Sequence, residues 1–152
     1  MITFEPLTEQ TLFIAKEIVH SNADYNLLEH GKAERSEAEI AKEFLEGRDS
    51  HAFIKADDTY IGLISFLDIN PKDSCPWIGL FMIHKDYQGY GYGTQAYFQF
   101  EEEWRQQGKE KIRLGVLVNN TAGKRFWEGL GYLRYQTASV NGKSVDCYEK
   151  AL

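Results

Sequence analysis

Three glycines alternate with large residues in the run Gln-Gly-Tyr-Gly-Tyr-Gly at positions 88–93. An apolar stretch at 77–83 precedes this run, and a helical pattern at 94–107 follows it. The start of a helix exposes unpaired backbone N–H groups and the positive end of the helix dipole. Because glycine lets a backbone approach an anion closely, strand, glycine loop and helix together predict a phosphate-binding loop. The alternative interpretation is a tight turn with a glycine-rich helix start.

The spacing of the glycines excludes the two commonest nucleotide-binding loops. A Walker loop requires Gly-Lys-Ser/Thr at its end, and no lysine follows Gly93. The dinucleotide fingerprint is Gly-x-Gly-x-x-Gly with an acidic residue about 20 positions on. Here Gly89, Gly91 and Gly93 alternate, and the expected strand at 111–118 carries no acid. The pattern that fits is Gln/Arg-x-x-Gly-x-Gly/Ala, beginning at Gln88.

Length and composition predict a single domain spanning residues 1–152. This length can bury a sizeable core. Hydrophobic residues make up 43% and charged residues 26% of the chain, which indicates a globular protein. No apolar run approaches the roughly 20 residues of a membrane span. The first residues lack the basic and apolar regions of a signal peptide, so we expect a cytoplasmic protein that does not bind membranes.

The charge of the chain and its cysteine and histidine content limit the classes of ligand that it is expected to bind. The net charge of −6 disfavours nucleic-acid binding and favours small cations or basic peptides. It therefore weighs against Tyr87, Tyr90 and Tyr92 as a platform for stacking nucleic-acid bases. Cys75 and Cys147 lack metal-ligand spacing and are expected to be free thiols. No metal site is predicted, since no metal motif is formed by the four histidines, His20, His30, His51 and His84.

The elements needed to position the loop can be read from periodicity and capping signals. A capping box begins at Ser36, and the pair Asn141-Gly142 predicts a hairpin. Residues 21–34 are expected to be irregular. Strands are expected at 2–6, 51–56, 60–69, 77–83, 111–118, 132–140 and 143–150. Helices are expected at 9–20, 37–46, 94–107 and 121–130. The fold class is therefore α/β, a mixed sheet with the order β-α-α-β-β-β-α-β-α-β-β and one right-handed parallel crossover.

A second motif follows the strand after the glycine-loop helix. It runs Asn-Thr-Ala-Gly-Lys-Arg-Phe-Trp-Glu-Gly-Leu-Gly-Tyr from Asn120 to Tyr132. This sequence is similar to Asn-x-x-Ala/Gly-x-x-Phe-Tyr/Trp-x-x-x-Gly-Phe/Tyr of the GNAT acetyltransferase superfamily. The run from Gln88 resembles the acetyl-coenzyme A loop of the same superfamily. The order of elements matches as well, so the resemblance covers nearly the whole chain and implies a splayed central sheet.

The resemblance implies that acetyl-CoA is the cofactor, acting as co-substrate. The backbone around Phe81, Met82 and Ile83 would pair with the pantetheine arm like an added strand. The backbone N–H groups that would hold the pyrophosphate belong to Gln88, Gly89, Tyr90, Gly91, Tyr92, Gly93 and Thr94. Family position places Asn120, Phe126 and Trp127 along the cofactor. The sequence does not fix the oligomeric state, although many members of the family are homodimers.

The reaction that the resemblance implies is direct attack of a neutral amine on the thioester carbonyl. Deprotonating a lysine-like amine of pKa ~10.4 at pH 7 costs about 4.6 kcal/mol, which calls for a base or an ordered water chain. Candidate bases are Asp68, Asp73 and His84. A water chain to backbone carbonyls would need no side-chain base. The backbone N–H of Met82 could stabilise the oxyanion.

This chain departs from the family pattern at two positions. Trp127 stands where many members have a tyrosine that protonates the leaving sulfur, and strand 77–83 lacks the carboxylate of many relatives. Expelling a thiolate of pKa ~8.5 without protonation costs only about 2 kcal/mol at pH 7. The thiolate therefore either leaves without a dedicated acid, which we favour, or takes a proton from a hydroxyl such as Tyr92, Tyr132 or Tyr148.

The expected function is that of an acyltransferase, an N-acetyltransferase acting on a primary amine of a small molecule or a peptide. The alternative is an acyl-CoA-binding sensor or interaction module with little or no catalysis. The resemblance would place the acceptor over residues 21–34 and the C-terminal hairpin, where Tyr25, Glu29 and Asp73 could face a cation.

Overall fold

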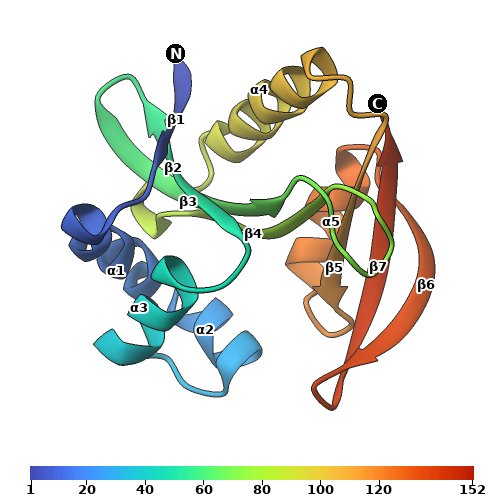
Figure 1. Cartoon of the computed structure of the whole chain (residues 1–152). Coiled ribbons are helices and arrows are strands. Elements are labelled where there is room, and N and C mark those ends of the chain that lie inside the picture. The colour runs from blue at the N-terminus through green and yellow to red at the C-terminus, as the bar shows by residue number, and fades with distance from the viewer. The chain divides into compact units, whose positions relative to one another are not determined.

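Most of the elements that patterning predicts are present in the computed structural model, which describes residues 1–152 (Figure 1). By their contacts the residues group into two units. The first unit comprises Met1–Phe66 and Leu80–Phe100, and the second comprises Leu67–Gly79 and Glu101–Leu152. Strand β4 (Trp77–Ile83) and helix α4 (Tyr92–Gln106) contribute residues to both units.

The order of the predicted elements is confirmed, and the structure adds one α-helix that was not predicted. The strands are β1 (Ile2–Pro6), β2 (Ser50–Ala56), β3 (Thr59–Leu67), β4, β5 (Lys111–Leu117), β6 (Leu133–Val140) and β7 (Lys143–Ala151). The α-helices are α1 (Leu12–Ser21), α2 (Ala23–His30), α3 (Glu37–Leu45), α4 and α5 (Thr121–Gly129). Two short 3-10 helices are η1 (Glu9–Thr11) and η2 (Lys85–Tyr87). None of the helices is both long and apolar enough to cross a lipid bilayer.

The strands form one seven-stranded mixed sheet in which β4 is shared. The hydrogen-bonded order is β1-β2-β3-β4 in the first unit and β4-β5-β7-β6 in the second. The pairs β1–β2, β2–β3, β5–β7 and β6–β7 are antiparallel. Strands β4 and β5 pair in parallel through Trp77↔Arg113 and Ile78↔Leu114. The predicted parallel pairing of the strands before and after α4 is therefore confirmed.

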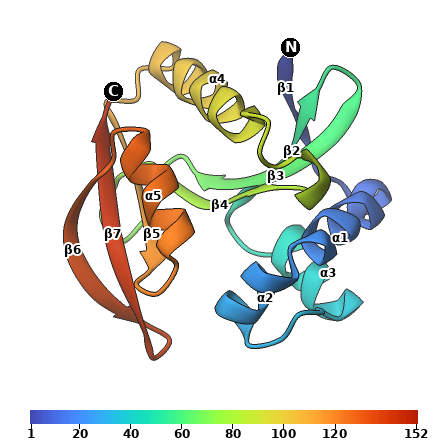
Figure 2. The ribbon, with the colours of Figure 1, turned by 180° about the vertical axis from the view of Figure 1, so that it is seen from behind.

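The core of the first unit lies on the face of the sheet that α1 and α3 cover. Figures 1 and 2 show α1, α2 and α3 grouped on the same side of β1–β3. The buried cluster joins these helices to strands β2, β3 and β4 and consists of Ala15, Ile18, Val19, Ile40, Phe44, Phe53, Leu63, Leu80 and Met82. Phe100 of α4 stacks edge-on with Phe4 of β1 at 5.7 Å between ring centroids. Helices therefore bury apolar side chains of this unit's strands.

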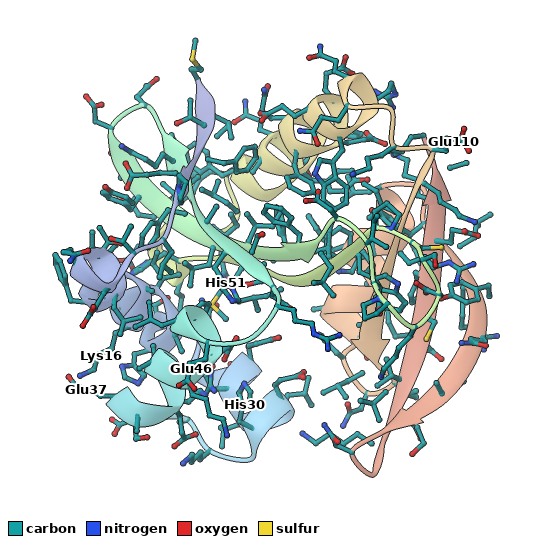
Figure 3. All side chains as sticks on the ribbon, in the orientation of Figure 1. Lys16, His30, Glu37, Glu46, His51 and Glu110 are labelled. Atoms are coloured by element: carbon teal, nitrogen blue, oxygen red, sulfur yellow. The ribbon has the colours of Figure 1, made fainter.

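Helix α3 begins where its capping box predicts. Ser36 Oγ accepts the backbone N–H of Glu39 at 3.1 Å, and Glu39 Oε1 accepts the N–H of Ser36 at 3.2 Å. Lys16 of α1 and Glu37 of α3 form an ion pair at 2.8 Å, and the two side chains face each other in Figure 3. The exposed ion pair links the two helices weakly, and the buried cluster of α1 and α3 side chains holds them together.

Helix α2 is an element that the sequence interpretation missed, because residues 21–34 were expected to be irregular. Leu27 is exposed, whereas the polar residue Asn26 is buried. Asn26 Nδ2 donates to the carbonyls of Val19 at 2.8 Å and Ala33 at 3.0 Å. A helix whose buried anchor is polar gives little hydrophobic periodicity, so patterning does not find it. Gly31 ends the helix with φ +78°.

The second unit is built on the hairpin that Asn141-Gly142 predicts. Both residues have positive φ, +51° and +79°, as a two-residue type I′ turn requires. Strand β7 lies between β5 and β6, and α5 is tied to it by Tyr148, whose hydroxyl donates to Glu128 Oε2 at 2.6 Å. Cys75 and Cys147 are buried free thiols, as expected.

Candidate functional site

The glycine motif lies in the first unit, between the end of β4 and the start of α4. Helix α4 begins at Tyr92, so the last two residues of the motif belong to its first turn. The sequence interpretation had placed them in the loop before the helix. Gly89 and Gly91 have φ of +86° and +85°. That region costs a residue with a Cβ atom roughly 1–2 kcal/mol. A Cβ atom at either position would meet nothing within 4 Å, so the backbone conformation alone requires glycine there.

The first turn of α4 offers backbone donors to an anion. The first backbone N–H of this turn that donates to a carbonyl one turn earlier is that of Gln95, which donates to the Gly91 carbonyl at 3.1 Å. The N–H groups before it have no such acceptor, and they lie at the positive end of the dipole of a 15-residue helix. No acidic residue stands in this first turn. The arrangement therefore has the chemistry of a phosphate cradle.

Gln88, the first residue of the motif, uses its donors inside the protein. Its Nε2 amide donates to Asn22 Oδ1 and to the carbonyl of Ile83, both at 2.8 Å. Its backbone N–H donates to the carbonyl of Lys85 at 3.3 Å. Because an amide side chain has two N–H bonds, Gln88 has no donor left for a phosphate in this arrangement. The contacts assign Gln88 to holding the loop.

The end of β4 carries the three residues expected along the pantetheine arm. The carbonyl of Ile83 is occupied, since it accepts from both Gln88 and Asn22 Nδ2, the latter at 3.1 Å. Met82 is buried, and its carbonyl lies against Gly62 of the neighbouring strand β3. Phe81, between them, is partly exposed. The roles of Phe81 and of the Met82 N–H toward a cofactor remain predictions.

His84, a candidate base in the first unit, follows β4 directly. Its Nδ1 accepts the backbone N–H of Asp86 at 3.0 Å, which places the proton of the neutral ring on Nε2. Its side chain is 13% exposed and stacks edge-on with Tyr87 at 5.8 Å. With one nitrogen accepting and the other protonated, the ring must give up the Asp86 hydrogen bond before it can take a proton from an amine.

The carboxylates of Asp68 and Asp73 lie in the second unit in contrasting environments. Asp68 is 60% exposed and faces Lys109 at 3.5 Å. Asp73 accepts hydrogen bonds from the Cys75 N–H at 3.0 Å, Trp77 Nε1 at 2.8 Å and Arg113 at 3.2 Å. Burial works to raise the pKa of Asp73, but these donors outweigh it and hold the pKa below its usual value. Asp73 is thereby a weak base, anchored between the 70–76 loop and β5.

Helix α5 carries the second motif. Asn120 is its N-cap, with Oδ1 accepting the N–H of Gly123 at 2.9 Å. A Cβ atom at position 123 would stand 2.6 Å from Asn120 Nδ2, so this cap requires glycine there. Trp127 is buried, and its ring meets those of Phe126 at 4.9 Å and Tyr132 at 5.3 Å. The motif therefore has a folding role, and contact of Asn120, Phe126 and Trp127 with a cofactor remains a prediction.

The three tyrosines considered as acids differ in their surroundings. Tyr148 is 1% exposed, and burial together with its bond to Glu128 raises its pKa to about 12. That phenol would protonate a thiolate only at a cost. Tyr132 is buried against Trp127. Tyr92 lies in the first turn of α4, its ring 6.3 Å from that of Tyr87.

A polar pair that the sequence did not single out lies in the first unit. His51 of β2 and Ser65 of β3 are cross-strand partners, joined at 2.6 Å between Nδ1 and Oγ. His51 packs edge-on against Phe44, and Figure 3 shows it pointing into the interior. Burial lowers the pKa of His51, against the opposing pull of Asp49 and Glu43, so the ring is neutral at pH 7.

Two further contributors were missed, and each left a signal in the sequence. Gly62 lies inside a largely apolar strand, a feature typical of close backbone approach. Asn22 precedes Ala-Asp, the composition of a helix start, and it occupies the N-cap position of α2. Neither signal names the partner. The contacts of Gly62 with Met82 and of Asn22 with Gln88 join residues far apart in the chain.

Comparison with known proteins agrees with this geometry. A family model described as the acetyltransferase (GNAT) family matches residues 15–132. An acetyltransferase from Thermus thermophilus has the same fold, with a TM-score of 0.83 at 18% identity, over 100% of this chain and 97% of that one. A search of curated proteins found no match.

Two further solved structures have the same fold. The Salmonella typhimurium acetyltransferase that modifies the N-terminal serine of ribosomal protein L7/L12 aligns with a TM-score of 0.81 at 16% identity, over 99% of this chain and 95% of that one. A ribosomal L7/L12 α-N-protein acetyltransferase in complex with coenzyme A aligns at 0.77 and 16%, over 99% and 94%. The family match covers most of the residues, including both motifs, and the family uses acetyl-CoA as acetyl donor. The chain belongs to the GNAT family of acetyltransferases.

Proposed function

We propose that this protein transfers the acetyl group of acetyl-CoA to a primary amine of a peptide or a small molecule. The observation that carries the proposal is the glycine turn at the start of α4. Its positive-φ glycines and first-turn N–H groups suit a pyrophosphate, and no carboxylate stands in that turn to oppose one. The loop supports binding of the donor, and the family supports acetyl transfer.

The reaction would proceed by direct attack. The amine nitrogen forms a bond to the thioester carbon, and the carbonyl oxygen takes up the electron pair as an oxyanion. The Met82 N–H is the proposed donor to that oxygen. Collapse of the intermediate breaks the carbon–sulfur bond, and coenzyme A leaves as a thiolate. The ammonium proton passes to solvent through a base or a water chain, because both carboxylate candidates are ion-paired and His84 Nδ1 is engaged.

The acceptor is proposed to be cationic. In the first unit acidic side chains are twice as numerous as basic ones, and an acidic surface raises the local concentration of cations. Two structural neighbours are named for N-terminal acetylation of ribosomal protein L7/L12, and another for N-acetylation of an alanine of ribosomal protein S18. A peptide α-amine is therefore the first acceptor to test, ahead of small polyamines.

The location proposed for this reaction is the cytoplasm. Both cysteines are reduced and buried, which fits a reducing compartment.

The first test is calorimetric titration of acetyl-CoA and coenzyme A into wild type and Gly91→Ala. Gly108→Ala is the matched control, because Gly108 has φ +86° and open space around it, like Gly91, but lies beyond the other end of α4. Both variants carry the same backbone strain. We expect micromolar binding that is weakened at least tenfold in Gly91→Ala alone. No binding to wild type would overturn the proposal.

The acceptor is then sought by mass spectrometry of a peptide panel incubated with acetyl-CoA. Each peptide is offered with a free and with a blocked N-terminus, beside free lysine side chains and a polyamine. We expect one acetyl group on free N-termini and none on blocked ones. Acetylation of the polyamine alone would reassign the acceptor to the small-amine class.

An acyl-CoA-binding module with little catalysis is the second candidate. It is favoured by the presence of Trp127 where many relatives have tyrosine, together with the ion-paired state of Asp73. Its signature would be tight binding of acetyl-CoA with no acetylated product and no coenzyme A release across the panel. Turnover of any amine at a rate above spontaneous hydrolysis would exclude it.

A further inference from the structure

Side chains at the junction between α1 and α2 form hydrogen bonds with the chain that leads into the glycine loop. Asn22 is the residue between the two helices, at the C-cap position of α1 and at the N-cap position of α2, where its side chain makes no capping hydrogen bond. Its backbone N–H donates to Val19 at 3.1 Å, and its carbonyl accepts from Asn26 at 3.0 Å. The backbone of Asn22 is therefore fixed by both helices, which leaves its side chain a firm anchor for something else.

The Asn22 side chain links the end of α1, where its Nδ2 lies 3.2 Å from both the Ile18 carbonyl and Ser21 Oγ, to the loop. Its Oδ1 accepts the Gln88 amide at 2.8 Å, while its Nδ2 lies 3.1 Å from the carbonyl of Ile83, the last residue of β4. Gln88 donates to the same carbonyl. Asn22, Gln88 and Ile83 thus form a closed triangle of hydrogen bonds. We name this triangle the latch.

Ser21 adds a second bond at the same place. Its hydroxyl donates to the carbonyl of Ile18 at 2.6 Å and accepts the backbone N–H of Lys85 at 3.1 Å. Lys85 begins η2, the short turn that leads into Gln88. The chain between β4 and α4 is therefore held at both Lys85 and Gln88 by two consecutive residues of the α1–α2 junction.

We propose that Asn22 is a positioning residue for the cofactor loop, acting through Gln88. With its side-chain amide fully engaged, Gln88 does not reach for a phosphate but fixes where the turn of Gly89 and Gly91 begins. The direction of the α4 N–H groups is thereby set before the cofactor arrives, which lowers the cost of ordering on binding. The proposal rests on the proposed function, because it takes the loop to bind coenzyme A.

The test compares coenzyme A binding by calorimetry in wild type, Asn22→Ala, Gln88→Ala and the double variant. Each single variant breaks the same triangle, so we expect each to weaken binding by roughly 10-fold. The double variant should bind coenzyme A no more weakly than the single variant with the lower affinity, because the effects of substituting two interacting residues do not add. Multiplication of the two effects would mean that Asn22 and Gln88 act independently, and would overturn the proposal.

Asn26→Ala is the matched structural control. Asn26 is also an asparagine bonded to the C-terminal end of α1, through Val19, but it makes no bond to the glycine loop. Its loss should lower the midpoint of thermal unfolding and leave coenzyme A affinity within about 3-fold of wild type, a prediction that follows from contact alone. Equal weakening of binding by Asn26→Ala would show a general effect of destabilising the junction, and would also overturn the proposal.

Rescue and kinetics separate positioning from simple destabilisation. Asn22→Asp keeps the acceptor for residue 88 and loses the donor to Ile83, while Gln88→Arg supplies a cation that can pair with the new carboxylate. The combined variant should recover most of the lost affinity. In steady state the KM for acetyl-CoA should rise in Asn22→Ala with kcat at saturation within about 3-fold of wild type, as for lost uniform binding. A fall in kcat with KM unchanged would contradict positioning of the loop.

A ligand-free measurement keeps this inference distinct from the proposed function. The unfolding free energies of the same four proteins give the Asn22–Gln88 coupling energy without any cofactor. Coupling with no coenzyme A binding by wild type would overturn the proposed function and leave the latch a structural feature only. Binding by wild type without coupling would overturn the positioning role and leave the proposed function standing.

Discussion

The backbone carbonyl of Met82 on β4 lies against Gly62 on β3, closer than the carbonyl could lie to any other residue type. A Cβ atom at position 62 would clash with the Met82 oxygen and would also come within 3.1 Å of the Ile83 side chain. A backbone oxygen cannot move aside as a flexible side chain can. Gly62 therefore sets the position of the Met82–Ile83 peptide group, which directly follows the Met82 N–H that is proposed to face the thioester.

Gly62→Ala is expected to displace the Met82 peptide. Forced overpacking costs about 1–3 kcal/mol of unfolding free energy, and a displaced catalytic group reduces kcat by roughly 10- to 100-fold. Urea denaturation and steady-state kinetics measure the two effects. Gly129→Ala, with open space around it and no positive φ, is the control and should not lower stability. Unchanged kcat in a destabilised Gly62→Ala would remove Met82 from the mechanism.

Asn120 is expected to combine a capping role with a cofactor role, and two substitutions distinguish them. Asn120→Ala removes the cap of α5 and should cost about 0.5–2 kcal/mol of stability. Asn120→Asp keeps an oxygen for the Gly123 N–H and should leave stability within about 0.5 kcal/mol, since aspartate caps equally well. Calorimetry of coenzyme A with the aspartate variant isolates the Nδ2 group. Wild-type affinity in Asn120→Asp would mean that Nδ2 makes no contact with the cofactor.

Asp73 is expected to stabilise the protein in a pH-dependent way. Its pKa lies below the unfolded value of ~3.9, so its contribution is present above that pH and is lost as the pH falls through the lower, folded pKa. Asp73→Asn should therefore cost about 1–3 kcal/mol at pH 7, and the difference from wild type should shrink below about pH 4. Urea unfolding at several pH values measures this dependence.

Asp68→Asn is the matched control for Asp73. Asp68 is 60% exposed and its lysine partner is at 3.5 Å, so its loss should change stability by less than about 1 kcal/mol at any pH. The two variants also test the base. A fall in kcat/KM of about 100-fold in one of them, with the lost activity reappearing at higher pH, would assign the base to that carboxylate.

Tyr148→Phe is expected to be a stability variant and not a catalytic one. A phenol of pKa about 12 lies roughly 3.5 units above a thiol of ~8.5 and is a poor acid toward its thiolate. We expect kcat within about 3-fold of wild type, an unchanged alkaline limb of the pH–rate profile and the loss of about 1–2 kcal/mol from the Glu128 hydrogen bond. Loss of the alkaline limb in this variant, but not in Tyr92→Phe, would identify Tyr148 as the acid.

The local parts of the fold could be predicted from the sequence. The strand at Trp77–Ile83 has the bounds that its apolar run indicates. Ser36 and Asn120 cap helices as predicted, because a capping motif involves only residues within about four positions of each other. Helix α2 could not be predicted, since its buried anchor is an asparagine whose partners lie outside the helix.

The candidate site shows the same limit. The glycines of the loop follow from their types and spacing. The partner of Gln88 does not, because the Asn22 bond spans 66 residues and depends on how α1 packs beside β4. In the same way, the sequence made Asp73 a candidate base. Its hydrogen bond from Trp77 and its ion pair with Arg113 could be found only in the structure.

The buried free thiols Cys75 and Cys147 both belong to the second unit, and so do all three tryptophans, Trp77, Trp104 and Trp127. Tryptophan fluorescence, excited where tyrosine does not absorb, and thiol labelling therefore observe that unit alone, whereas far-ultraviolet circular dichroism observes the helices of both. Coincident transitions by all three probes would establish that the chain unfolds as one cooperative body, and an earlier dichroism transition would mean that the first unit melts separately.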